Sequence, residues 1–245
     1  MPATLYLVPS VLGDGAPIQT LPAATLAILQ RLDHLVVETP KQARRFLKLA
    51  GVALADRPLH IEVLDEHTPE SRLPALLAPA LAGSDLGIVS DAGCPGVADP
   101  GARLVRLAHA HAVRVVPLVG PSSILLALMA SGLNGQRFVF HGYLPVEAAR
   151  RDRTVRTLEL AARRRQETQI MIEAPYRNNR LLQALLGVCA PGSLLCLAAD
   201  VTLASEWIVT RTIAQWRADC PDIDRRPTVF LLGAETSSGA AAHCI

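Results

Sequence analysis

One glycine- and proline-rich segment has the residue types of a ligand-binding loop: Ser90-Asp-Ala-Gly-Cys-Pro-Gly-Val-Ala-Asp-Pro-Gly101. It follows an apolar run that is typical of a buried strand, and it precedes a helical pattern. Open α/β sheets bind ligands outside the carboxyl ends of their strands. The glycines let a ligand approach the backbone, and Asp91 adds a carboxylate. A plain connection in which Asp99-Pro100 starts the helix is the alternative.

A second segment, Val115-Val-Pro-Leu-Val-Gly-Pro-Ser-Ser123, also runs from a strand through a turn into a helix. We expect the hydroxyls of Ser122 and Ser123 to line the same cleft as the first loop, because both loops leave carboxyl ends of strands. Helix capping by Ser122 is the alternative. Neither segment has the Gly-Lys-Ser/Thr of a phosphate-binding P-loop, so the pattern disfavours that class of nucleotide site.

The elements that must position these loops alternate between strands and helices. In the first half, strands are predicted at 5–8, 35–38, 86–90 and 113–117, and helices at 22–32, 42–50, 73–82 and 101–111. This βαβ alternation predicts the α/β class with a largely parallel sheet.

A second series of elements follows a predicted helix at 123–131. Its strands are predicted at 138–141, 169–173, 194–198 and 228–232, and its helices at 151–165 and 178–188. The spacing of strand and turn signals changes at Gly120-Pro121. We therefore expect two α/β domains, 1–119 and 120–235, and a flexible tail at 236–245 that is rich in Ala, Ser and Gly.

Composition excludes several classes of protein. Of 245 residues, 50% are hydrophobic and 19% are charged, so the chain can bury a core and is not a disordered tail. We expect no membrane span and no secretory signal, and therefore a cytoplasmic protein. The five cysteines form no C-x-x-C pair and no metal-ligand spacing, so neither a disulfide framework nor a metal site is expected.

Arginines are concentrated in one predicted helix. The formal net charge is only +2, yet residues 150–165 hold seven arginines against two acids. Such a helix can follow the phosphates of a nucleic acid, and it is the strongest signal for an RNA partner. A solvated helix face is the alternative, because aromatic residues, which would stack on bases, make up only 4% of the chain.

The motifs together resemble a known family. They are Leu5-Tyr-Leu-Val-Pro9, Val89-Ser-Asp-Ala-Gly-Cys-Pro95, Asp99-Pro-Gly101, Val116-Pro-Leu-Val-Gly-Pro-Ser122, Gly142-Tyr-Leu-Pro145 and Glu173-Ala-Pro-Tyr-Arg177. This order is similar to that of the tetrapyrrole methylase-like (class III) S-adenosylmethionine methyltransferases, and most similar to members that methylate a cytidine 2′-hydroxyl of 16S rRNA. The resemblance implies a two-domain α/β fold, a homodimer, S-adenosylmethionine bound in the cleft between the domains, and a small ribosomal subunit as partner.

The resemblance also assigns residues to the cofactor. In the first domain they are Pro9, Ser90, Asp91, Ala92, Gly93, Val97, Ser122 and Ser123, and in the second domain they are Met171 and Thr228. This set suits a sulfonium cofactor, because a positive charge and an adenosine call for carbonyls, a carboxylate and apolar surface, and for no metal.

Methylation of a hydroxyl also needs a proton acceptor, since a sugar hydroxyl is not ionised near neutral pH. Glu38, at the end of a predicted strand beside the cleft, is the candidate base, and a solvated carboxylate is the alternative. Glu173 and Arg177 are further catalytic candidates from the Glu-Ala-Pro-Tyr-Arg motif. A buried ion pair that fixes the loop is their alternative role.

Two segments depart from the family pattern. Glu38-Thr-Pro-Lys41 has one acid where the pattern has two, and Ala199-Asp-Val-Thr-Leu203 lacks an arginine and a lysine. Because these changes remove positive charge, two alternatives stay open beside RNA methylation. One is a methyltransferase for a tetrapyrrole or another small-molecule acceptor, and the other is a non-catalytic S-adenosylmethionine-binding module.

Overall fold

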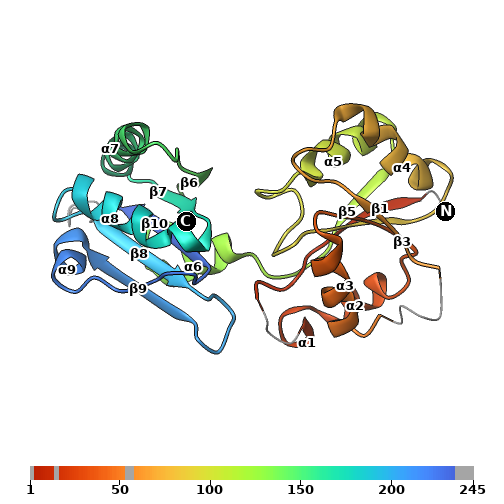
Figure 1. Cartoon of the computed structure of the whole chain (residues 1–245), viewed down its shortest axis with the longest axis horizontal. Helices are drawn as coiled ribbons and strands as arrows, with labels where there is room; N and C mark the ends of the chain where they lie inside the picture. Colours follow the sequence, from red (N-terminus) through yellow and green to blue (C-terminus); the bar gives the residue numbers. More distant parts are fainter. Residues whose placement is uncertain (1–2, 14–16, 53–57, 235–245) are drawn as a thin grey trace, which may run out of the picture. The chain divides into compact units, whose positions relative to one another are not determined.

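The computed structural model describes residues 3–13, 17–52 and 58–234, and it divides the chain into two compact units. Unit 1 is Met1–Ser122 and unit 2 is Ser123–Ile245 (Figure 1). The division therefore falls just after the expected boundary between residues 119 and 120. The expected tail at 236–245 lies outside the described residues.

Unit 1 contains a five-stranded sheet in the order β3-β2-β4-β1-β5, in which every neighbouring pair is parallel. The strands are β1 (Thr4–Val8), β2 (His34–Val37), β3 (His60–Val63), β4 (Leu86–Val89) and β5 (Arg114–Pro117). The predicted parallel sheet is confirmed, and four of its strands were predicted to within one residue at each end. The edge strand β3 was not predicted.

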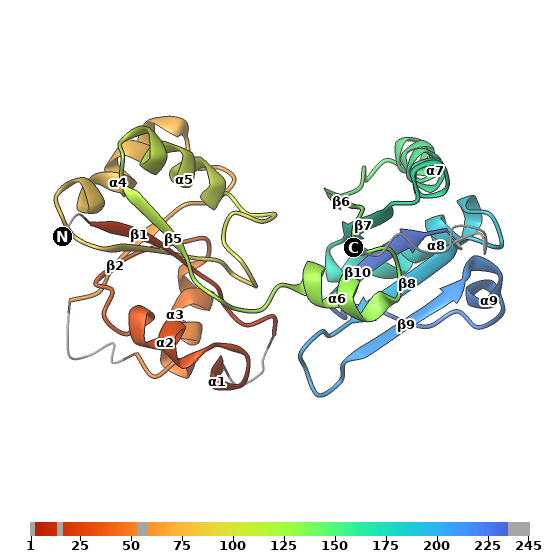
Figure 2. The same cartoon turned by 180° about the vertical axis from the view of Figure 1, so that it is seen from behind.

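Helices cover both faces of this sheet (Figures 1 and 2). One face carries α1 (Pro17–Thr20), α2 (Ala23–Leu29) and α3 (Pro40–Leu49), and the other carries α4 (Leu73–Leu81), preceded by a 3₁₀ turn at Glu70–Arg72, and α5 (Gly101–Ala110). Because successive side chains of a strand point to opposite faces, β2 serves two cores: Leu35 and Val37 join one cluster, and Val36 joins the other. The sheet is thus buried on both sides, as parallel sheets are.

Unit 2 is built on a mixed sheet in the order β6-β7-β10-β8-β9. Strands β6 and β7 are parallel, whereas β7–β10, β10–β8 and β8–β9 are antiparallel. The elements are α6 (Ser123–Ser131), β6 (Phe138–Tyr143), α7 (Ala148–Arg165), β7 (Thr168–Ile172), a 3₁₀ turn η2 (Pro175–Arg177), α8 (Asn178–Val188), β8 (Leu194–Ala199), β9 (Trp207–Thr212), α9 (Ile213–Ala218) and β10 (Thr228–Gly233).

The core of unit 2 lies between the sheet and helices α7, α8 and α9. Trp216 is fully buried there, and its indole N–H donates to the Leu195 carbonyl at 2.8 Å. The Trp207 ring meets it edge-on with a centroid separation of 5.8 Å. The two tryptophans therefore pack against each other in this unit rather than offering a stacking platform for bases. Among the helices that the structure describes, none is long and apolar enough to cross a membrane.

Candidate functional site at the carboxyl edge of the parallel sheet

The topology of unit 1 opens a crevice at the carboxyl ends of two neighbouring strands. Strands β1 and β4 lie side by side, but the chain leaves β1 toward α1 and α2 on one face and leaves β4 toward α5 on the other. When the connections from two neighbouring strands run to opposite faces of the sheet, the loops that follow the strands move apart. Ligands of open α/β sheets bind between such loops. The first loop predicted from sequence follows β4 and therefore lies at this crevice.

Three loops contact one another at this edge. The Ser10 N–H donates to the Gly93 carbonyl at 2.9 Å, which joins the loop after β1 to the loop after β4. The Cys94 thiol lies 3.5 Å from the Pro121 carbonyl, which joins the β4 loop to the segment after β5. The two loops singled out in the sequence are therefore neighbours in space.

Two glycines make this close packing possible. Gly93 has a φ of +71°, a conformation that residues with a side chain rarely adopt. At Gly120 a β-carbon would lie 2.6 Å from Cβ of Pro9, so a side chain there would collide with the first residue after β1. Pro9 itself is buried. The backbone at the crevice is thus held in a rigid arrangement.

Asp91 connects the β4 loop to the loop after β2. Its Oδ1 accepts a hydrogen bond from the Thr39 N–H at 3.1 Å, and its Oδ2 accepts one from the Thr39 hydroxyl at 2.6 Å. Hydrogen bonds to a carboxylate are stronger than those between neutral groups. Asp91 therefore fixes the residue that follows Glu38 and begins α3.

Glu38 is a half-buried carboxylate that accepts no hydrogen bond from any described residue. Burial raises the pKa of Glu38, and the nearby carboxylates of Asp91 and Asp99, followed by those of Glu66 and Asp65, raise it further. A carboxylate with a raised pKa and no donor of its own is the kind of group that can accept a proton from a substrate. Glu38 does not line the large cavity at this edge and lies instead in a small depression with Asp99 and Gly101, so its role as the base stays a prediction.

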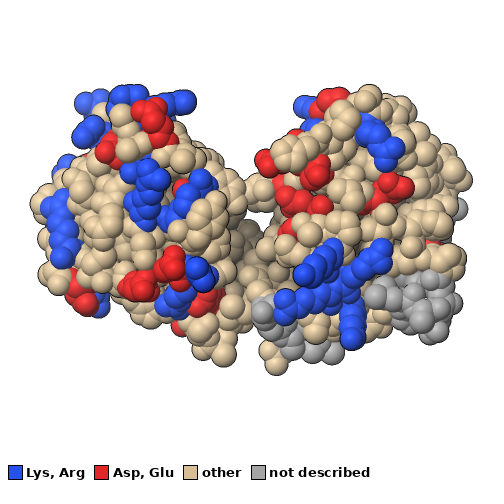
Figure 3. All heavy atoms as spheres, in the orientation of Figure 1, with Lys and Arg blue, Asp and Glu red and all other residues tan. Residues whose placement is uncertain are grey.

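The other carboxylates at this edge hold their own loops. Oδ1 of Asp99 accepts from the N–H groups of Gly96 and Gly101 at 2.6 and 2.8 Å. Oδ1 of Asp65 accepts from the Thr68 hydroxyl at 2.7 Å. Together with Glu38 and Asp91 they make the edge acidic, which favours a cationic group such as a sulfonium and disfavours a phosphate. Figure 3 shows acidic side chains gathered on unit 1, with a group of basic ones nearby.

A cavity of about 490 Å³ opens beside the crevice, large enough for a small organic ligand. It is lined by Ser10, Val11, Leu12, Gly13, Thr39, Lys41, Gln42, Arg45, Phe46, Leu49, Asp91 and Ala92. The Ser10 hydroxyl is buried and has no hydrogen-bond partner among the described residues. A buried hydroxyl without a partner is costly, so its presence at a cavity wall suits a site that receives a polar ligand group.

Sequence reasoning missed Ser10, Thr39 and the side of α3 that faces this cavity. The missed residues of α3 include Lys41, Gln42 and Arg45. The sequence held one usable signal for them. Ser10 comes shortly after β1, and Thr39 and α3 come shortly after β2, so all of them lie at the same sheet edge as the predicted loop.

The remaining predicted residues of unit 1 have different surroundings. The Ser90 hydroxyl is buried and donates to the Ala92 carbonyl at 3.2 Å, so it shapes its own turn. Val97 is 46% exposed in the same loop. Ser122 ends unit 1, and Ser123 starts α6 in unit 2.

The predicted residues of the second domain all lie in unit 2. Met171, on β7, is fully buried in the core cluster. Thr228 starts β10, and its hydroxyl donates to the Arg226 carbonyl at 2.8 Å. Glu173 and Arg177 form an ion pair in which two nitrogens of Arg177, Nη2 and Nε, lie 2.7 and 3.0 Å from the same Glu173 oxygen, Oε1. The structure therefore shows the ion pair of the alternative interpretation. A catalytic role for Glu173 and Arg177 stays a prediction.

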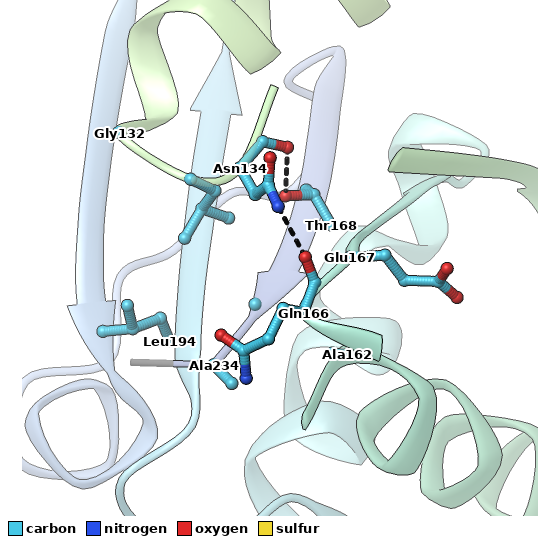
Figure 4. Close-up of a pocket in the computed structure, with 10 residues that line it drawn as sticks. Gly132, Asn134, Ala162, Gln166, Glu167, Thr168, Leu194 and Ala234 are labelled. Atoms are coloured by element: carbon cyan, nitrogen blue, oxygen red, sulfur yellow. Dashed lines mark hydrogen bonds between the residues drawn. The ribbon is translucent and has the colours of Figure 1, made fainter. Parts of the chain in front are cut away.

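Unit 2 also contains a small pocket where α7 meets β7 (Figure 4). The Asn134 side-chain amide donates to the Gln166 carbonyl at 2.6 Å, and the Thr168 hydroxyl donates to the Asn134 carbonyl at 2.9 Å. Its volume is about 70 Å³, far below that of sites for cofactors. These hydrogen bonds hold the turn between α7 and β7 against the segment that follows α6, and the pocket is not a cofactor site.

The chain is similar over most of its length to proteins named ribosomal RNA small subunit methyltransferase I. It is 31% identical to the protein of Vibrio cholerae over 239 residues, which are 96% of this chain and 78% of that protein. It is 33% identical to the protein of Xylella fastidiosa over 214 residues, 87% of this chain and 74% of that one. The protein of Escherichia coli O157:H7 is 31% identical over 204 residues, 83% and 67% of the two chains.

The fold has a counterpart among solved structures. A crystal structure of the methyltransferase CobJ matches with a TM-score of 0.63 and 24% sequence identity, over 98% of this chain and 96% of that one. At this identity the match describes the fold alone. No family model matches the sequence.

Proposed function

Because the chain belongs to the tetrapyrrole methylase family of S-adenosylmethionine-dependent methyltransferases, we propose that it methylates RNA, at a ribose 2′-hydroxyl of a cytidine in 16S rRNA. The relatives that share about a third of its sequence are named for action on small-subunit ribosomal RNA. The observation that carries the proposal is Glu38: a half-buried carboxylate at the end of β2, with a raised pKa and no hydrogen-bond donor among the described residues.

The residues at the carboxyl edge fit S-adenosylmethionine. The backbone of Ser10 and Gly93, held by the close approach of Gly120 to Pro9, would cradle the cofactor, and the Asp91 region would face its charge. When bound, the cofactor supplies a methyl group on a positively charged sulfur. Met171 and Thr228 of unit 2 remain proposed contacts, and so does the placement of the cofactor between the two domains.

In this proposal the chain's own residues have three tasks. Asp91 and Thr39 hold the loop that positions Glu38. The Glu38 carboxylate takes the proton of the acceptor hydroxyl as the oxygen becomes a nucleophile. The rigid loops keep donor and acceptor in line, since positioning is the main demand of a displacement at a methyl carbon.

A second candidate acceptor is a small molecule such as a tetrapyrrole. The segment Ala199–Leu203 favours it, because Asp200 stands there with its carboxylate paired to Arg226 at 2.9 Å. That arrangement leaves no free positive charge at a place where the family pattern has an arginine and a lysine. A homodimer and a cytoplasmic location also remain proposals.

The test uses S-adenosylmethionine with a labelled methyl group and small ribosomal subunits from cells that lack the gene. We expect label in 16S rRNA, and nuclease digestion should release it as a 2′-O-methylated cytidine. Large subunits serve as the control acceptor. Label in a small-molecule fraction of the extract, with none in rRNA, would replace the RNA proposal by the second candidate.

A further inference from the structure

Unit 2 carries an arginine-rich surface at the start of α7. Figure 3 shows basic side chains gathered over this helix. Arg150, Arg153 and Arg156 are exposed, and no ion pair joins any of them to an acid that the structure describes. Exposed arginines alone do not define a site, but one arginine of this surface, Arg151, is buried.

Arg151 occupies a position on α7 where the helical period calls for an apolar residue. The buried residues of the helix are Arg151, Val155, Leu158 and Ala162, a single stripe with spacings of three and four. Only 9% of Arg151 is exposed. Removing a cation from water is costly unless a partner compensates its charge.

The chain itself compensates Arg151 poorly. Its Nε is buried and has no hydrogen-bond partner within the described residues. The nearest acid is Asp152, whose Oδ1 lies 3.7 Å from Nη2, beyond hydrogen-bond distance, and that oxygen also has no partner. Asp152 therefore compensates the charge of Arg151 only through an ion pair at 3.7 Å that makes no hydrogen bond.

Arg151 lies at the bottom of a shallow surface depression, too narrow to admit a water molecule, to which three segments of unit 2 contribute. Beside it are Arg177 of η2, Arg180 near the start of α8, and Glu173. One oxygen of the Glu173 carboxylate, Oε1, accepts from Arg177 at 2.7 and 3.0 Å and from the Ala174 N–H at 2.7 Å. Glu173 thus neutralises Arg177, and the pocket keeps the positive charges of Arg151 and Arg180.

A second arginine-lined pocket adjoins the first at the start of α7. It has a volume of about 280 Å³ and is lined by Pro145, Arg150, Arg153, Thr154 and Thr157. The last four residues share one face of the helix. The Thr154 and Thr157 hydroxyls donate to the Arg150 and Arg153 carbonyls, so the two guanidinium groups are the donors that this opening offers to phosphate oxygens.

An exposed aromatic ring lies next to the first pocket. Tyr176 is 70% exposed, and the Arg177 guanidinium lies 5.5 Å from the centre of its ring. A ring at this place offers a face on which a base can stack. A free inorganic anion has no base and would gain nothing from such a ring. This observation favours a nucleic acid over a small anion.

We propose that these two pockets and Tyr176 form a docking surface for the backbone of single-stranded or looped RNA, in which the exposed Arg150, Arg153 and Arg180 contact phosphates and the buried Arg151 adds positive charge behind them. The inference rests on the proposed function and specifies where the RNA contacts unit 2. Guanidinium forks match phosphate oxygens, and neutralising phosphates makes RNA binding dependent on salt.

The experiment measures the affinity of the full chain for a fluorescently labelled 16S rRNA fragment over a range of salt concentrations. Arg180→Gln removes a charge from the pocket, and Arg164→Gln removes an exposed charge from the last turn of α7 as the matched control. We expect Arg180→Gln to lower the slope of log affinity against log salt by about one, and Arg164→Gln to leave the slope unchanged.

A second variant tests the stacking role. Tyr176→Ala should weaken RNA binding on the order of tenfold and leave the salt slope as in the wild type. A merely structural role of these residues would instead lower the melting temperature, which is measured for every variant. The proposal would be overturned if the two arginine variants gave equal salt slopes. It would also be overturned if inorganic phosphate stabilised the wild type while Arg180→Gln had no effect on RNA affinity.

Failure of the docking surface can be distinguished from failure of the proposed function. If the wild type methylates small subunits but the two arginine variants bind RNA alike, the docking surface is wrong and the activity stands. If Arg180→Gln lowers the slope but no methyl group reaches rRNA, the surface stands and the acceptor is wrong. Binding of S-adenosylhomocysteine should be the same in all variants, because none of them changes a residue that is proposed to contact the cofactor.

Discussion

Glu38 is the residue on which the proposed chemistry depends. The carboxylate must be ionised to accept a proton, and burial together with the neighbouring carboxylates raises its pKa. We therefore expect the rate of methyl transfer to fall as the pH is lowered through this raised pKa. In Glu38→Gln that acidic limb should disappear, and the rate should drop by roughly 10²–10⁴-fold.

Rates of labelled methyl transfer, measured over a series of pH values, check this prediction. The affinity for S-adenosylhomocysteine serves as the control, and it should change little in Glu38→Gln. An unchanged rate in the variant would show that another group takes the proton.

The same raised pKa also affects stability. The folded state binds a proton at Glu38 more tightly than the unfolded state does, so stability falls as the pH rises from the ordinary carboxyl pKa through the raised one. Above this window Glu38→Gln should melt at a higher temperature than the wild type. Below the ordinary carboxyl pKa the difference should vanish. A variant that is less stable than the wild type at neutral pH would contradict the assigned electrostatics.

Some single residues were predictable and others were not. Asp91 and Gly93 could be identified from sequence, because a carboxylate and glycines after an apolar strand form a local pattern. Thr39 and Ser10 act through contacts with residues far along the chain, and no local pattern reports such pairing. Asp91, for example, holds a residue 52 positions away.

At the scale of elements, the contact between the β4 loop and the β2 loop can be tested by a double-mutant cycle. Asp91→Ala and Thr39→Val should each cost about 1–3 kcal/mol of unfolding free energy, because each leaves a partner without its hydrogen bond. The double variant should cost less than the sum of the two. Urea denaturation measures all four proteins, and strict additivity would show that the two loops are independent.

The approach of Gly120 to Pro9 is a second element-scale test. Gly120→Ala places a β-carbon against the Pro9 ring, and overpacking of this kind costs about 1–3 kcal/mol. Because the loops after β1 and β5 must separate, affinity for S-adenosylhomocysteine should fall as well. Gly192→Ala is the matched control, since nothing lies within 4 Å of a β-carbon there. Equal binding and stability in the two variants would show that the close approach does not shape the site.

Sequence patterns predicted most elements but missed three that matter. Strand β3 is a mostly exposed edge strand of only four residues, His-Ile-Glu-Val, too short for its alternation of polar and apolar residues to stand out. Strand β9 is partly buried along its length, and the short α9 begins with a capping box at Thr212 and Gln215. Short edge elements carry little hydrophobic periodicity, so tertiary pairing decides them.

The whole molecule combines two units with different surfaces. Unit 1 has an acidic edge suited to a cation, and unit 2 has an arginine-rich surface suited to phosphates. The formal net charge of +2 reports neither surface, because each unit carries charges of both signs that are grouped locally (Figure 3). The arginine-rich helix was visible in the sequence, but the burial of Arg151 and its convergence with Arg180 depend on the packing of α7 against α8.

The most direct test of this account is a calorimetric titration of the purified chain with S-adenosylhomocysteine. We predict saturable heat for the wild type, similar heat for Glu38→Gln, and a much weaker signal for Asp91→Ala, which loosens the crevice loops. If the wild type releases no heat with this compound, the carboxyl edge of unit 1 is not a cofactor site.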